Sequence, residues 1–410
     1  MPFSVYALGL AVFAQGTSEF MLSGLLSGIS DDLRVSIPAA ALLTSAFAVG
    51  MVIGAPLMAL LGRNWQRRRA LLFFLCVFAA VHAVGAATSS YGLLLATRVV
   101  AALANAGFWA VALVTAVALA GPGARARATS VVVGGVTVAC VAGVPAGAWL
   151  GGQWGWRAAF WAVALVSLPA IAVIAATIPA GRPPAALPSA RAELRSLAGR
   201  RLRLTLLTSA LVQGATFCAF SYLEPIAVHV TRFGPAWVPV LLALFGVGSF
   251  VGVTVCGRVI DSRPVALTSA GLVALTAGWA LFAAAADSRV AVIALVLVLG
   301  MLAFGTGTAL ISHVFRLAED APTLAGSFAT SAFNVGGALG PWLGGLAIGA
   351  GLGFRSPLWV SALLMLLALG TAGASRGGLR GRDRRPRGRG RRRPCPCAPR
   401  GPHSCPRRPR

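Results

Sequence analysis

Long apolar segments alternate with short polar segments along almost the whole chain. Each of twelve apolar segments holds about 18 or more residues, enough to cross roughly 30 Å of hydrocarbon as a helix. Backbone groups in lipid must be hydrogen bonded within the protein, which favours helices over the shorter, alternating strands of a barrel. The pattern predicts an all-α membrane protein with spans at residues 4–26, 39–61, 70–88, 92–118, 128–150, 157–178, 204–227, 237–258, 266–286, 290–312, 325–349 and 357–374.

The second half of the chain repeats the first. The segment "FAVGMVIG" at 47–54 matches "FGVGSFVG" at 245–252 in four identities, at an offset of 198 residues. The same offset relates "GWRAAFW" at 155–161 to "GFRSPLW" at 353–359. A single offset that relates residues in many spans is hard to obtain by chance. The repeat predicts two pseudo-symmetric six-helix bundles, a layout typical of transporters whose substrate path lies between the halves.

Composition shifts divide the chain into four segments. The connection between the two repeats opens on the Pro-rich stretch "PAGRPPAALP", and the chain ends in a low-complexity stretch rich in Arg and Pro. Such segments cannot bury enough apolar surface to fold alone. The predicted domains are an N-terminal bundle at 1–178, a cytoplasmic linker at 179–203, a C-terminal bundle at 204–374 and a disordered cytoplasmic tail at 375–410.

The charges indicate both the compartment and the orientation. Hydrophobic residues make up 57% of the chain, and its 35 basic and 10 acidic residues are too few to cover a soluble globule of 410 residues. All the basic residues are arginine; the loops of one side hold fifteen and those of the other side five, before the tail is counted. The positive-inside bias therefore predicts a multi-pass cell-membrane protein with both termini cytoplasmic.

The net charge of +25 does not indicate a nucleic-acid partner, because the tail alone carries 14 arginines and one acid. The remaining positive loops are expected to face anionic membrane lipids. Arg, Pro, Gly and Ala also have GC-rich codons, so this tail is what GC-rich DNA yields in an unintended frame. A frame change or a neutral extension is favoured over a binding role, which stays open.

The sequence lacks the motifs of an enzyme or a cofactor site. It has no nucleotide-binding loop, no nucleophile and base set, and no haem or zinc spacing, so a transport step must draw on a gradient. Cys395, Cys397, His403 and Cys405 are loosely spaced like metal ligands, but the arginines between them would repel a cation. We expect no metal, no cofactor and no enzymatic activity.

One carboxylate lies inside the first span. Glu19 stands in "AQGTSEFMLSGLL" at 14–26, and a charge at mid-bilayer costs about 2.5–3.5 kcal/mol unless it has a partner, a wet cavity or a proton. Gln15, Glu19 and Ser23 share one helix face, and Arg98 in the fourth span lies at a similar depth. Glu19 and Arg98 are therefore predicted to couple transport to protons by alternate pairing and protonation. The alternative is a static buried ion pair.

Four segments carry a family resemblance: "FAQGTSEFMLSGLL", "LLTSAFAVGMVIGAPLMA", "RATSVVVGGVTVACVAGVPAGAWLG" and "GSFATSAFNVGGALGPWLGG". With them the chain resembles the major facilitator superfamily over residues 1 to about 374. It is most similar to the twelve-span drug:proton antiporters, in particular the bacterial chloramphenicol-resistance exporters. The resemblance implies the major facilitator fold and export by alternating access.

The resemblance also assigns residues to gating. The antiporter signature is intact in the eleventh span and blurred in the fifth, and Arg63 replaces the aspartate usual after the second span. Small residues four apart let helices approach closely, and proline permits a bend. The gating residues so implied are Gly143, Pro145, Arg258, Asp261, Gly336, Gly340 and Pro341.

The substrate is expected to lie against apolar residues and a few hydrogen-bonding groups. The predicted substrate-binding residues are Gln15, Asn105, Phe108, Trp109, Gln213, Phe217, Phe220, Tyr222, Phe333 and Asn334. The leading hypothesis is a monomeric, proton-coupled exporter of an amphiphilic antibiotic, with chloramphenicol first. The alternatives are an exporter of sugars or other metabolites, and a membrane-tethered binding protein that acts through its basic tail.

Overall fold

The computed structural model describes residues 2–61, 65–120, 124–179, 199–259, 264–317 and 322–380. The predictions for Arg63, Asp261, most of the linker and the tail beyond residue 380 lie outside the described residues. Residues Met1–Ser375 form one compact unit and Arg376–Arg410 a second. Because both predicted bundles belong to the first unit, the domain boundaries at residues 178 and 204 stay a prediction.

The described residues are helical almost throughout. The first half contains α1 (Phe3–Phe20), η1 (Met21–Gly24), α2 (Leu26–Leu33), α3 (Ile37–Leu61), α4 (Arg67–Ala87), α5 (Tyr91–Ala120), α6 (Arg125–Val138), η4 (Ala139–Gly143), α7 (Val144–Trp154) and α8 (Trp156–Thr177). The second half contains α10 (Arg200–Ser221), α11 (Leu223–Pro225), η5 (Ile226–Val230), η6 (Pro235–Trp237), α12 (Val238–Val259), α13 (Pro264–Ala285), α14 (Arg289–Leu317), α15 (Pro322–Ala347), η7 (Ile348–Leu352) and α16 (Ser356–Arg380). Within the described ranges, twelve helical segments are long and apolar enough to cross a membrane, which confirms the predicted all-α class and its twelve spans.

The first, fifth and seventh predicted spans are not single straight helices. The first breaks at the 3-10 turn η1 and restarts as α2, and the seventh ends as α10 and continues as α11 and the π-helical turn η5. The fifth consists of α6 and α7 joined by the π-helical turn η4. Pro145 at the start of α7 has no N–H to donate, so the regular ladder cannot continue through it and the turn before it widens.

The two halves use the repeated glycines in the same way. A Cβ added to Gly50 in α3 would lie 2.7 Å from the Cβ of Ala102 in α5. A Cβ added to the equivalent Gly248 in α12 would lie 2.1 Å from the carbonyl oxygen of Leu297 in α14. In each half the second span therefore packs backbone to backbone against the fourth.

Equivalent arginines of the repeat also form ion pairs, but with acids at different positions of the repeat. Arg157 at the start of α8 pairs with Asp32 and donates to the carbonyl oxygen of Thr88 at 3.0 Å. Arg355 before α16 pairs with Asp287. The hydrogen bond from Arg157 holds the pKa of the Asp32 carboxyl below its usual value. Each pair joins segments of one half, so neither holds the halves together.

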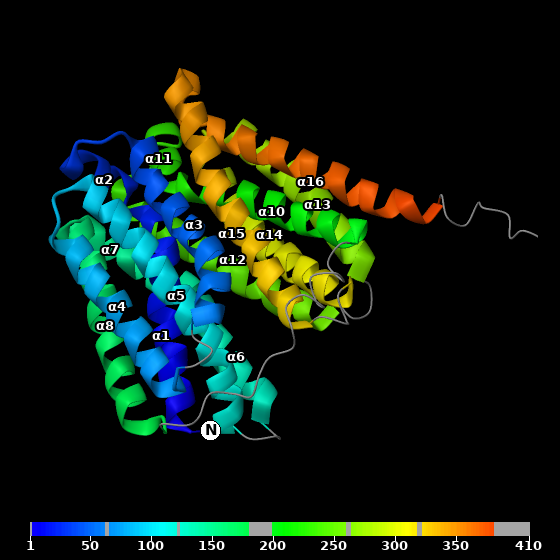
Figure 1. Cartoon of the computed structure of the whole chain (residues 1–410). Helices are drawn as coiled ribbons and strands as arrows, with labels where there is room; N and C mark the ends of the chain where they lie inside the picture. Colours follow the sequence, from blue (N-terminus) through cyan, green and yellow to red (C-terminus); the bar gives the residue numbers. More distant parts are fainter. Residues whose placement is uncertain are drawn as a thin grey trace, which may run out of the picture. The chain divides into compact units, whose positions relative to one another are not determined.

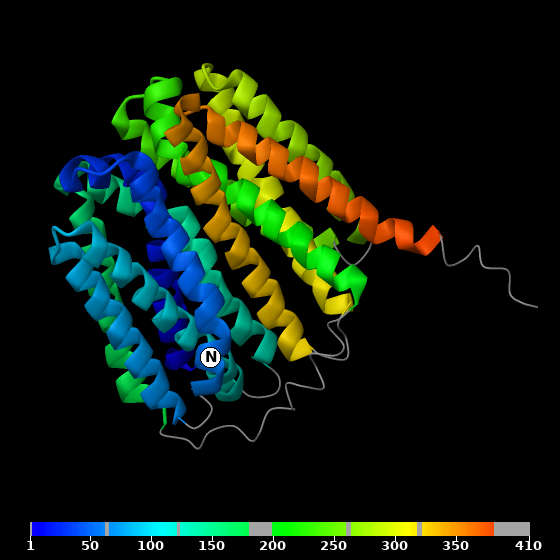
Figure 2. The same cartoon turned by 45° about the horizontal axis from the view of Figure 1, so that its top comes forward.

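The halves meet along α3 and α15, which lie side by side in Figures 1 and 2. The Ser45 hydroxyl in α3 donates to the carbonyl oxygen of Ala338 in α15 at 2.7 Å. We call the end of the unit that carries α2, α11 and η6 the α2 end. A Cβ on Gly345 would lie 3.2 Å from the Cβ of Pro38 near that end. These contacts run from the α2 end to about the middle of α3 and α15.

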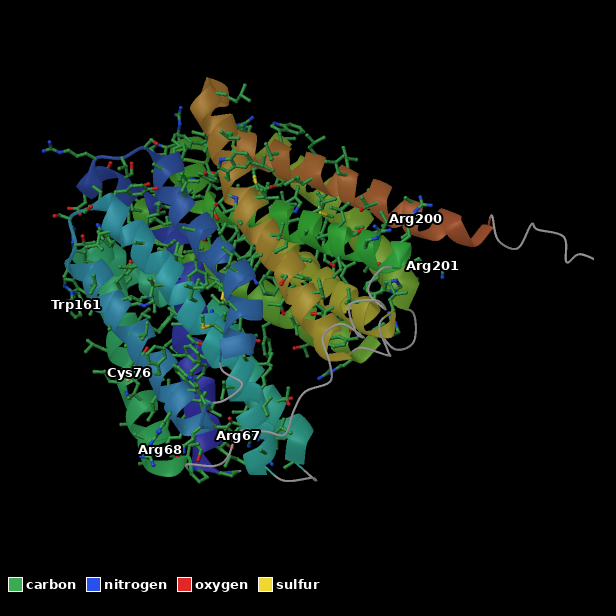
Figure 3. The ribbon with its side chains drawn as sticks, in the orientation of Figure 1. Arg67, Arg68, Cys76, Trp161, Arg200 and Arg201 are labelled. Atoms are coloured by element: carbon green, nitrogen blue, oxygen red, sulfur yellow. The ribbon has the colours of Figure 1, made fainter. Side chains whose placement is uncertain are left out.

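The surface of the unit has an apolar flank and a basic end. Trp161 on α8 is 45% exposed, Cys76 on α4 is exposed, and both lie on the flank of the first half (Figure 3). Arg67 begins α4 and Arg200 begins α10, at the end of the unit away from α2 (Figure 3). An apolar flank between polar ends is the surface expected of a helical membrane protein.

Candidate functional site

A small cavity lies between the two halves, beside Glu19. Its volume is about 50 Å³, enough for water but not for a larger ligand in this conformation. The lining residues come from α1, α3, α10 and α15 and are Glu19, Thr44, Phe47, Ala48, Gln213, Phe217, Phe333, Asn334 and Gly337. Glu19 is the one titratable side chain among them, so the carboxylate reaches a polar space that both halves share.

An aromatic cluster adjoins this cavity. We call Phe20, Phe217, Phe220, Phe245 and Phe304 the phenylalanine cluster. These rings line a second, smaller cavity of about 10 Å³ together with Cys140, Val144 and Thr216. The ring centroids of Phe20 and Phe217 are 5.5 Å apart, and those of Phe220 and Phe245 are 4.6 Å apart. Phe217 lines both cavities, so a polar compartment and an aromatic compartment share one wall.

Arg98 bonds to the residue next to Glu19. Its Nη1 donates to Ser18 Oγ at 2.8 Å and its Nη2 to the Ser18 carbonyl oxygen at 2.9 Å. The guanidinium also lies over the Phe47 ring, 4.6 Å from the centroid. Among the described residues no ion pair joins Arg98 to Glu19. The predicted pairing is therefore not made in this conformation, although Arg98 from α5 bonds to the turn of α1 that carries Glu19.

His82 completes the network around Arg98. Its Nε2 lies 2.6 Å from Ser18 Oγ, and its Nδ1 lies 2.7 Å from the Phe78 carbonyl oxygen. A carbonyl oxygen only accepts, so Nδ1 carries the proton and Nε2 accepts from the Ser18 hydroxyl. With the imidazole neutral, Ser18 receives a hydrogen bond from Arg98 and donates one to His82.

His82 was not singled out in the sequence analysis. A usable signal existed: a short connection joins α4 to α5, so residues equally far from it lie at equal depth. His82 lies six residues before Thr88, and Arg98 lies seven residues after Tyr91. These similar separations place both polar side chains in one layer of the bundle.

The predicted substrate-binding residues are divided by the structure. Gln213, Phe217, Phe333 and Asn334 line the cavity beside Glu19, and Phe217 and Phe220 belong to the phenylalanine cluster. The others lie outside both cavities: Gln15, Asn105 and Phe108 are fully buried, Trp109 is half-buried, and the Tyr222 hydroxyl donates to the carbonyl oxygen of Pro341 at 2.8 Å. Their substrate role stays a prediction.

Two buried amides lie on the side of this layer away from the α2 end. Among the described residues neither amide atom of Gln15 has a hydrogen-bond partner, and Asn105 Nδ2 donates to Met51 Sδ at 3.4 Å while its Oδ1 has none. Unpaired buried amides cost free energy unless another conformation or a ligand satisfies them. Such groups are candidates for contacts made in a different state of the protein.

The predicted gating residues mainly pack helices together. Gly143 faces the Thr17 hydroxyl, Pro145 is half-buried and Arg258 is exposed. A Cβ on Gly336 would lie 2.1 Å from the Ala210 carbonyl oxygen, and one on Gly340 would lie 2.3 Å from the Gly214 carbonyl oxygen. The eleventh span therefore lies directly on the backbone of α10, and its gating role stays a prediction.

This contact predicts a large effect of Gly340→Ala on stability. The added Cβ would meet backbone atoms of Gly214 and Cys218, so α15 must move, at a cost of about 1–3 kcal/mol. Gly370→Ala in α16 is the matched control, because its Cβ would meet no atom within 4 Å. The midpoint of thermal unfolding of the purified protein should fall for Gly340→Ala and not for the control. Equal midpoints would contradict the packing argument.

The fold and the cavity between two repeated halves define a twelve-span transporter, and sequence comparison identifies its family. The Major Facilitator Superfamily model matches residues 8–330, and the chain belongs to this family. It is 50% identical over 372 residues to a chloramphenicol resistance protein of Streptomyces lividans, covering 90% of this chain and 95% of that one. It is 35% identical over 369 residues to the inner membrane transport protein YdhP of Escherichia coli K12, covering 90% and 94%.

Solved structures show the same fold. A bacterial homologue of the human lysosomal transporter Spinster, inward-facing and unoccupied, aligns with a TM-score of 0.76 at 17% identity, covering 92% of this chain and 97% of that one. The nucleoside transporter NupG aligns with a TM-score of 0.72 at 13% identity, covering 91% and 100%. The predicted family and the major facilitator fold are confirmed.

Proposed function

We propose that this chain exports chloramphenicol, or an antibiotic of similar amphiphilic character, across the cell membrane in exchange for protons. The observation that carries the proposal is the 50% identity to a chloramphenicol resistance protein over 95% of its length. The chain then acts as a transporter rather than an enzyme, as a monomer surrounded by lipid, with protons and the drug as its small-molecule partners.

The orientation follows from the arginines. With Arg67, Arg200 and the other loop arginines of that end in the cytoplasm, both termini are cytoplasmic and the α2 end faces outward. The contacts between α3 and α15 then close the outward side. Closure on that side corresponds to an inward-facing state, in which the cavity beside Glu19 is reached from the cytoplasm.

The two compartments suit an amphiphilic drug. The phenylalanine cluster can contact the edge and the face of an aromatic ring of the drug. Beside the cluster, Gln213 and Asn334 can form hydrogen bonds with hydroxyl or amide groups of the drug. Both compartments are small in this conformation, so drug entry requires the rings of the cluster to part. Glu19 in the same space can release its proton inward before the drug binds and regain one from outside after the drug leaves.

A susceptibility panel tests this function. The gene should raise the inhibitory concentration of chloramphenicol in a sensitive host, and a protonophore should abolish the labelled-drug efflux of the same cells. An empty vector and an unrelated membrane protein at matched expression are the controls. An unchanged drug panel, with the protein present in the membrane, would overturn the proposed substrate class.

Ending the chain at Ser375 should leave export and membrane insertion intact. All twelve spans, Glu19 and the phenylalanine cluster belong to the unit that ends at this residue. Export by the truncated and full chains is compared at equal membrane levels. Loss of export without loss of protein would instead favour a function of the basic tail.

A further inference from the structure

The α2 end contains a contact that the transport cavity does not include. Glu224 lies in α11 of the second half and is 9% exposed. Its Oε2 accepts a hydrogen bond from the backbone N–H of Ser27, in α2 of the first half, at 3.2 Å. The acid of one half therefore bonds to the backbone of the other.

Ser27 is the second residue of α2, and this position explains the bond. The first N–H groups of a helix have no partner within it. Residue Leu25 stands at the N-cap of α2 and gives no side-chain cap. A carboxylate near a helix N-terminus is favoured by the helix dipole and by the free N–H groups. Glu224 thus supplies from the opposite half the cap that α2 lacks.

The repeat places this contact at equivalent breaks of two spans. At the offset of 198 residues Glu224 corresponds to Leu26, the first residue of α2. The first span breaks just before Leu26, and the seventh breaks just before α11. The two breaks face each other across the halves, and only the second half carries an acid there. The contact is consequently asymmetric, with the acceptor in one half and the donor in the other.

The surroundings leave room for the contact to open. A cavity of about 550 Å³ lies around it, lined from both halves by residues that include Ser27, Asp31, Trp156, Glu224, His229 and Phe354. When the halves part at this end, the carboxylate and the freed N–H can be hydrated, so no charge is left buried and unpaired. A bond made in one state and replaced by water in the other biases the equilibrium between them.

The geometry points to Glu224 as a latch that holds the α2 end closed by capping α2 of the opposite half. This inference rests on the proposed alternating access and adds a residue that sets the balance of its two states. The latch depends on how far the acceptor oxygen of residue 224 reaches, because the donor is a backbone amide. It does not depend on which drug is carried.

Distances across the α2 end measure the latch directly. In a variant with its cysteines replaced, spin labels at Gln153 in α7 and Val290 in α14 report the separation of the halves; Gln153 is exposed and Val290 is 78% exposed. Glu224→Ala should raise the ratio of long to short distances about tenfold in the drug-free protein, the effect of losing one hydrogen bond to a charged group. Asp287→Ala is the matched control, because it removes an acid of the same half that pairs within that half.

Two conservative variants keep the test decisive if Glu224→Ala does not accumulate. Glu224→Gln keeps the reach and an acceptor oxygen but not the charge, so its distances should lie between those of the parent and those of Glu224→Ala. Glu224→Asp keeps the charge but withdraws the oxygens, so it should shift toward long distances. Parent-like distances in both Glu224→Asp and Glu224→Ala, or a shift in the Asp287→Ala control equal to theirs, would overturn the latch. If the distances shift in these variants but the susceptibility panel shows no change, the proposed substrate is rejected and the latch is retained.

Discussion

Glu19→Gln should abolish uphill accumulation of the drug while leaving exchange of labelled for unlabelled drug intact. Glutamine keeps the shape and hydrogen bonding of the protonated acid but cannot release a proton. Glu19 is the one titratable group among the residues that line the cavity beside it, so no neighbour in that cavity can replace it. The halves should still alternate, but without coupling to the gradient.

Chloramphenicol is neutral, so its exchange for one proton moves net charge. Export by the parent protein should therefore draw on the membrane potential, at about 2.3 kcal/mol per charge per 100 mV, as well as on the pH gradient. Proteoliposomes with an imposed gradient measure accumulation, and the same vesicles without a gradient measure exchange. Asp287→Asn, an exposed acid outside the cavity, is the control. Full proton-driven accumulation by Glu19→Gln would remove the carboxylate from the mechanism.

Phe217→Ala should weaken drug binding about thirtyfold or more. Phe217 lines both cavities, and its ring lies 5.5 Å from Phe20 and 6.3 Å from Phe220. Removing an aromatic ring at the centre of a binding surface typically costs 2 kcal/mol or more, and each 1.4 kcal/mol is a factor of ten in affinity. Equilibrium binding of labelled drug to purified protein measures the change.

The control for this variant is Phe250→Ala in α12. Phe250 is 52% exposed and lies outside the phenylalanine cluster, so its loss removes an aromatic ring without touching the cavities. Binding should be unchanged there. Equal loss of affinity in both variants would indicate a general effect on the bundle rather than contact between the drug and Phe217.

The structure brings some of the predicted site residues together, and their chemistry explains why they stand out in the sequence. Glu19 and Arg98 stand out in sequence because a charge within an apolar span is costly, and the structure places Arg98 on the residue next to Glu19. Gln213, Phe217 and Asn334 were predicted from their polarity or ring type and do line the cavity beside Glu19. Tyr222 was predicted on the same grounds but bonds to Pro341 instead. Residue type alone did not separate these cases.

Three members of the phenylalanine cluster had no usable signal in the sequence. Phe20, Phe245 and Phe304 are aromatic residues in apolar spans, as are many others that face lipid. In a soluble helix the polar stripe marks the solvent side and so identifies the buried face. In a bilayer both faces are apolar, and the inward face carries no comparable mark.

By itself the sequence determined the twelve spans, the repeat at an offset of 198 residues and the family, because these depend on local hydropathy and on short motifs read along one chain. Only the tertiary structure decided that Arg98 bonds to Ser18 and His82 joins them, and that Glu224 caps α2. Those contacts depend on how each helix is rotated and where its neighbours break. Rotation and breaks arise from packing between segments 64 to 197 residues apart, and no local pattern encodes them.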